Sequence, residues 1–98
     1  MENTVAERNG LDVGFTFRDD GTFDFWHSGV DYFASGNYTY TDTHIIFTNA
    51  TATRGGIDMG SRPNSTQRYG FAVDSKTEFR LYKDNPYQEY GDGPYVKR

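Results

Sequence analysis

The 98-residue chain contains no cysteine, and it has few of the aliphatic residues that usually build a protein core. Without cysteine it can form neither a disulfide framework nor a thiolate metal site. Valine, isoleucine and leucine total ten residues, and the two leucines and five alanines are too few for a helical bundle. No apolar run approaches the roughly 18 residues of a transmembrane helix. The opening residues also lack the basic and apolar regions of a secretory signal.

Familiar catalytic motifs are absent as well. The sequence holds no P-loop, no G-x-S-x-G motif and no histidine pair at metal-ligand spacing. The 10 basic and 14 acidic residues give a net charge of −4, which argues against general nucleic-acid binding and is too mild for a DNA mimic. We therefore expect no metal, cofactor, nucleic acid or membrane as a partner, and we favour binding over catalysis. Nothing in the sequence assigns a cellular compartment.

What the chain has in abundance is aromatic side chains, with 17 Phe, Tyr and Trp residues. A buried aromatic side chain removes roughly 150–250 Å² from water, so this set can supply the core that ten aliphatic residues cannot. Many of the aromatic residues recur at every second position, which is the period of a β-strand with one buried face. The composition and the period together favour a folded all-β domain over a disordered chain.

Three β-hairpins are predicted from this alternation. They cover residues 13–27, 36–48 and 68–82, with turns at Asp19-Asp20-Gly21, Asp42-Thr43 and Asp74-Ser75-Lys76. In the first turn Gly21 is expected to supply a positive φ. Regular hairpins on this scale predict a small antiparallel up-and-down β-barrel or a strongly curved sheet of six to eight strands.

The chain is expected to form a single domain over residues 1–98. Outside the three hairpins its structural signals are weaker. Residues 1–12 are expected to form a lead-in segment that is either a helical turn or frayed. Residues 49–66, rich in Ala, Thr, Gly, Ser and Asn, predict a long loop that is functional, mobile or conceals a short strand. Residues 83–98 predict a Tyr- and Gly-rich tail in which Pro94-Tyr95-Val96 adds a last edge strand.

Three stretches have a familiar order: D-G-T-F after Phe17, S-G-N-Y from Ser35, and I-I-F-T from Ile45. Together they resemble the small microbial lipocalin-like domains of the calycin type, and the resemblance covers about residues 13–82. It implies a barrel with an internal pocket, but neither a particular ligand nor a catalytic residue. Such domains usually open with a strand carrying Gly-x-Trp, which residues 1–12 lack. In that case the chain is a shortened form, the barrel is open on one side, or a partner chain supplies the missing strand.

The leading functional hypothesis is a pocket for a small apolar or planar ligand, with residues 49–66 as a flap. A barrel of about eight strands has little room, so the same side chains alternatively just fill the interior. His27 shares its strand face with Phe23 and Phe25, and its alternative is an exposed position at the strand end. The predicted lining is Phe15, Phe17, Phe23, Phe25, His27, Tyr38, Tyr40, Phe71 and Phe79.

Two other classes of function stay open. A protein-interaction or inhibitor module would use Trp26, an open sheet edge and the late tyrosines Tyr87, Tyr90 and Tyr95, either in a homodimer or with another protein. A small barrel cyclase or isomerase would rely on His27 and an inward tyrosine.

Overall fold

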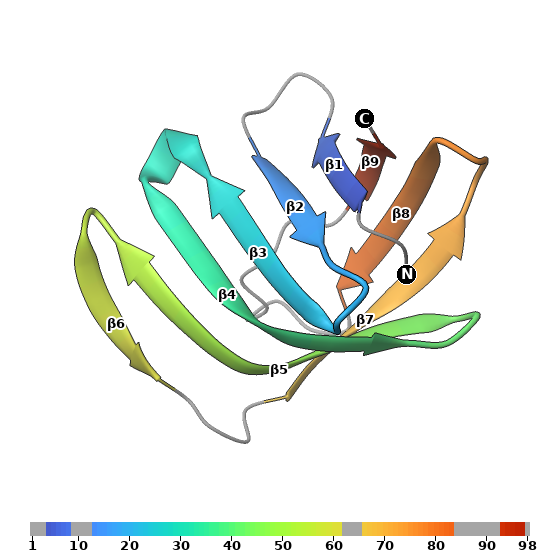
Figure 1. Ribbon diagram of the computed structural model, residues 1–98. Coiled ribbons are helices and arrows are strands. Elements are labelled where there is room, and N and C mark those ends of the chain that lie inside the picture. The colour runs from blue at the N-terminus through green and yellow to red at the C-terminus, as the bar shows by residue number, and fades with distance from the viewer. Residues whose placement is uncertain (1–3, 9–12, 62–65, 84–92, 98) are drawn as a thin grey trace.

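The computed structural model describes residues 4–8, 13–61, 66–83 and 93–97, which form β-strands and one short 3₁₀ helix, η1 (Figure 1). Every strand pairing within these residues is antiparallel. The elements are β1 (Thr4–Arg8), β2 (Val13–Phe17), β3 (Thr22–His27), η1 (Ser28–Val30), β4 (Tyr32–Tyr40), β5 (His44–Arg54), β6 (Ile57–Ser61), β7 (Thr66–Val73), β8 (Glu78–Lys83) and β9 (Gly93–Lys97).

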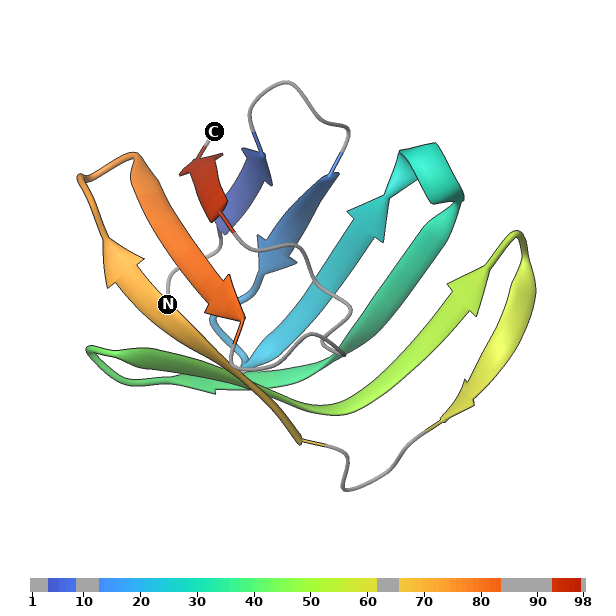
Figure 2. The same cartoon turned by 180° about the vertical axis from the view of Figure 1, so that it is seen from behind.

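Eight of these strands close into a barrel. Their order around the wall is β4-β3-β2-β1-β9-β8-β7-β5, and β5 completes the circle by pairing with β4. Strand β6 is added outside the circle, where its described residues pair with β5. Figures 1 and 2 show β6 at the tip of a curved wing of sheet that leaves the barrel. The predicted all-β, antiparallel up-and-down barrel is confirmed.

Both chain termini take part in closing the wall. Strand β1 lies between β2 and β9, so the lead-in predicted for residues 1–12 is wrong where Thr4–Arg8 are concerned. Strand β9 pairs with β1 and with β8, so it is no edge strand. The sequence signal was weak because β1 contributes only the small Ala6 to the core and β9 only Tyr95. Their place in the barrel depends on partners at opposite ends of the chain.

The long loop predicted over residues 49–66 is also wrong for most of its length. Strand β5 continues to Arg54, and after a tight turn at Gly55-Gly56 the chain returns as β6. Small threonine and alanine side chains gave this stretch no hydrophobic alternation, so the strand pattern was hidden. Of the three alternatives given for this segment, the structure supports a concealed short strand, β6.

A β-bulge divides β5 into two halves. Between the pairs Asn37↔Thr48 and Ser35↔Thr51, β4 advances two residues and β5 advances three. Asn49 takes up the extra residue with a φ of 54°. A Cβ on Gly36 would stand 2.8 Å from the carbonyl oxygen of Thr48, so glycine permits this close approach. The bulge bends β5, which pairs with β7 up to Thr48 and with β6 from Thr51 onward.

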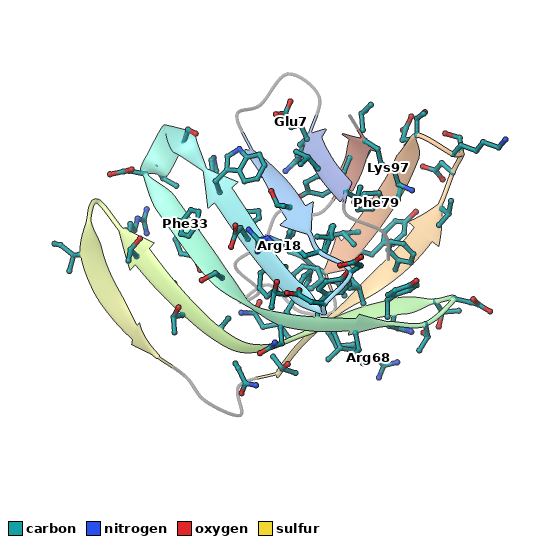
Figure 3. The ribbon with its side chains drawn as sticks, in the orientation of Figure 1. Glu7, Arg18, Phe33, Arg68, Phe79 and Lys97 are labelled. Atoms are coloured by element: carbon teal, nitrogen blue, oxygen red, sulfur yellow. The ribbon has the colours of Figure 1, made fainter. Side chains whose placement is uncertain are left out.

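Aromatic rings fill the closed part of the barrel. The ring centroid of Phe15 lies 5.4 Å from that of Phe47 and 5.2 Å from that of Tyr95, and those of Phe17 and Phe79 are 6.1 Å apart. These contacts join side chains from different sides of the wall, as expected for an eight-strand barrel with little interior space. Figure 3 shows Phe79 directed into this interior.

We expect Phe15→Ala to lower the free energy of unfolding by about 3–5 kcal/mol, because the fully buried ring stands at the centre of these contacts. The matched control is Phe33→Ala on the outer surface, where the side chain is 45% exposed, and its cost should stay below about 1 kcal/mol. Urea unfolding monitored by the fluorescence of Trp26 measures both. Equal losses in the two variants would contradict the proposed core.

Candidate functional site

The predicted pocket residues share the barrel interior, but most of them contact one another. Phe15, Phe17, Phe23, Phe25 and Phe79 are buried, and each lies in a ring contact with another aromatic side chain. The closed part of the barrel is therefore occupied by its own side chains. Any ligand site has to lie beyond this packed cluster.

The remaining predicted aromatic residues lie toward the end of the barrel that carries the turns after β2, β4 and β7. Here Tyr38 is buried, Phe71 is partly buried, and Tyr40 is largely exposed beside both, with ring centroids 6.4 and 6.3 Å away respectively. We call this end the turn end. The opposite end, where β1, β3 and β5 finish, is called the open end.

Some core residues were missed or misassigned at the sequence level. Phe47 and Tyr69 belong to the core, with ring centroids 5.6 Å apart, although the predicted lining omitted both. Tyr95 was expected on an interaction surface, which is wrong because it is fully buried between Phe15 and Phe79. Its position in a short terminal strand concealed this. The other two tail tyrosines, Tyr87 and Tyr90, lie outside the described residues.

Hydrogen bonds fix the first turn at the turn end. Gly21 has a φ of 86°, as predicted, and the Asp20 carboxylate accepts hydrogen bonds from the hydroxyl and backbone N–H of Thr22. These two bonds lower the pKa of Asp20. Arg18 forms an ion pair with Asp24, which raises the pKa of its guanidinium. The hydroxyl of Tyr38 donates to the carbonyl oxygen of Arg18 at 2.7 Å, which ties the turn to β4.

The inward surface near the open end differs from the aromatic cluster because its side chains are small. Beyond the bulge, the second half of β5 presents Ala50 and Ala52 to the core, and Ala52 pairs with the buried Ala34 of β4. Phe25 lies opposite Ala34 on the other side, so an aromatic ring borders this alanine surface. We call Ala34, Ala50 and Ala52 the alanine wall.

His27 lies at the open end, where it pairs with Val13 on β2 and with Tyr32 on β4. Both of these partners are buried, so register places the half-buried His27 on the inward face of β3, and its ring lies beside the exposed Gly29 of η1. His44 is on a different strand and contacts Arg68 on the outer surface, with 3.1 Å between its Nε2 and Nη2 of Arg68. Figure 3 shows Arg68 outside the barrel. Among the described residues, no His, Asp and Glu side chains gather in a group suited to a metal ion.

The outer surface of the wing carries a second feature. Trp26 lies opposite Phe33, and its ring covers Gly14, where a Cβ would approach to 2.4 Å from Trp26 Cζ2. Phe33 is exposed beside a shallow groove of about 350 Å³, and Figure 3 labels it on β4. Trp26 therefore lies on the face opposite His27, as predicted. The groove is lined by Phe33, Ser35, Thr51, Ala52, Thr53 and Gly56.

Comparisons with protein-family models, with curated proteins and with solved structures found no match for this chain. The closed antiparallel barrel is compatible with a calycin-like fold, and this compatibility is one of architecture alone. No helix within the described ranges has the length and apolar character needed to cross a membrane. Any function therefore has to be inferred from the arrangement of the side chains.

We expect Tyr38→Phe to destabilise the protein by about 0.5–1.5 kcal/mol at neutral pH, because it removes the hydrogen bond to Arg18. Burial raises the pKa of the Tyr38 hydroxyl, so the protonated form is favoured in the folded state. The contribution of this hydroxyl is complete below about pH 10 and declines as the pH rises through the raised pKa. Urea unfolding at neutral and alkaline pH should show the difference between parent and variant narrowing above about pH 10. If the difference in free energy of unfolding between parent and variant is the same at neutral and alkaline pH, the proposed role of the Tyr38 hydroxyl is wrong.

Proposed function

We propose that this protein is a non-enzymatic, lipocalin-like binding module that holds a small apolar or planar ligand at the open end of its barrel. The observation that carries the proposal is the change in side-chain size along the interior. Large rings pack against one another in the closed part, whereas the alanine wall replaces them beyond the bulge. Ala34 is fully buried, whereas Ala50 and Ala52 are only partly buried and would offer contact area to a ligand.

Two further features favour this position. Strand β5 leaves β7 after Thr48, so the wall bearing Ala50 and Ala52 extends past the part of the barrel that β7 closes. Phe25 and Tyr32 border the same surface with ring centroids 5.9 Å apart, and Tyr32, the less buried of the two, would be the ring that contacts a planar ligand. A predominantly apolar surface with a few polar groups at its margin is typical of small-molecule sites.

The test is ligand-induced stabilisation by an uncharged probe, 2-naphthylmethanol. A ligand present at about 100 times its Kd should stabilise the folded state by about 2.7 kcal/mol, which a thermal melt registers as a rise in Tm. Ala52→Leu extends a side chain into the proposed site and should weaken binding about tenfold, as measured by isothermal titration calorimetry.

The matched control is Thr53→Leu, one residue further along β5 and on the outer surface. It should leave probe affinity unchanged. If no probe raises the Tm, the proposal is wrong. If Thr53→Leu weakens binding while Ala52→Leu does not, the ligand occupies the outer groove and the inward site is excluded.

A second candidate function is self-association through the wing. Within the described residues β6 has a strand partner on one side, and an edge strand can pair with a strand of another molecule. The groove beside Phe33 adjoins the turn at Gly56 that leads into β6. Ile57, at the start of this edge, is 73% exposed. The edge and the groove together would form a contact with a second copy of the chain.

Light scattering over a range of protein concentrations tests this candidate. The expected result is a dimer whose formation Phe33→Ser weakens, because the exposed ring would be buried in the contact. Tyr82→Ser is the matched control, since Tyr82 is similarly exposed on the outer surface of β8. A monomer at every concentration, or equal effects of the two substitutions, would exclude this mode of association.

A further inference from the structure

Basic side chains ring the inward surface at the open end of the barrel. Each of them has a buried register partner, and register partners on neighbouring strands point to the same face; Arg54 also pairs with the exposed Ile57 of β6. Arg54 pairs with Tyr32, Arg8 with Tyr95, and Lys83 with Tyr69. His27 also pairs with Tyr32, from the opposite side. We define the basic rim as Arg8, His27, Arg54 and Lys83.

Among the paired strand residues that the structure describes, register places no carboxylate on this inward face, while Asp31 lies at the same end between η1 and β4. In the salt bridges Arg18–Asp24 and Arg80–Asp74, the strand residues Asp24 and Arg80 alternate with inward-facing residues and so lie on the outer face. The turn end holds the aspartates of the turns after β2, β4 and β7, namely Asp19, Asp20, Asp42 and Asp74. A chain with a net charge of −4 therefore places a group of basic side chains beside its proposed ligand site.

The backbone makes room for one member of the basic rim. Gly93 begins β9 with a φ of 117°, a conformation that glycine adopts at no steric cost. A Cβ at this position would lie 3.6 Å from both Nε and Nη2 of Arg8. The guanidinium of Arg8 thus lies across a residue without a side chain, close to the buried residues Leu81 and Tyr95.

From this arrangement we infer that the ligand is an amphipathic anion: a small molecule with an apolar body and a carboxylate. The inference rests on the proposed function. The apolar body would contact Ala50, Ala52 and Tyr32, while the carboxylate would be bound by the basic rim. Arg54 and His27 lie on the two strands that flank β4, roughly 9–10 Å apart with Tyr32 between them, so a carboxylate placed between them would contact both only through the length of the Arg54 side chain.

The physical basis is charge pairing at the edge of an apolar surface. Arginine presents a planar set of donors that matches a carboxylate, and hydrogen bonds between charged groups are stronger than neutral ones. Several basic side chains on the inward face of the described strands favour an anion over a neutral compound. The rim would therefore select the ligand class, whereas the alanine wall would contribute affinity that depends little on charge.

The experiment compares two probes with the same ring system, 2-naphthoate and 2-naphthylmethanol, by isothermal titration calorimetry on the full chain. We expect the carboxylate to bind about tenfold more tightly or better. Arg54→Gln should remove most of that preference and leave the affinity for the alcohol unchanged. Arg8→Gln should act in the same direction. The control Arg68→Gln removes the same charge from the outer surface and should leave both affinities unchanged.

The outcomes separate the two proposals. If both probes bind with equal affinity, the anion preference is overturned while the proposed binding site stands. If neither probe binds, the proposed function fails and the anion preference fails with it. An equal loss in Arg68→Gln and Arg54→Gln would show that net charge, and not the basic rim, governs affinity. Should Arg8→Gln not fold, Arg54→Gln suffices for the test, because Arg54 is exposed at the end of β5.

Discussion

The bulge at Asn49, opposite Gly36, is the constraint on which the rest of this architecture depends. Before the bulge the inward residues of β5 are Ile45 and Phe47. After it they are Ala50 and Ala52, because one extra residue reverses the alternation, and the strand also turns away from β7. An unbroken alternation would have placed threonines 51 and 53 inside. The packed aromatic cluster therefore ends at the bulge. Beyond the bulge, β5 pairs with β6 to form the wing, and the alanine wall lies toward the open end.

The packed core and the proposed binding site are separated along the barrel as a consequence. The closed part obtains its stability from ring contacts across the interior, where eight strands leave space for side chains and little else. The open end contributes fewer large side chains and carries the basic rim. A binding site that is separated from the main core in this way can vary in sequence with little cost to stability.

The sequence predicted much of the fold but less of the site. The three hairpins, the turn at Gly21 and the inward position of Phe15 follow from local alternation and turn chemistry. Strands β1, β6 and β9 were missed or left uncertain because each is only five residues long, and β1 and β9 each present a single buried apolar side chain, Ala6 and Tyr95. The fully buried Tyr95 was misassigned for the same reason. Short strands of this kind are stabilised by pairing with distant segments, which a local pattern does not record.

Composition and period by themselves determined that this is an all-β protein with an aromatic core, because strand alternation and residue volume are local properties of the chain. Only the tertiary structure decided which of those aromatic residues pack against one another and where small side chains replace them. It also brought Arg8, His27, Arg54 and Lys83 to one end of the barrel, although they lie in four separate strands. Barrel closure and the phase shift at the bulge set that arrangement, and both depend on register between strands.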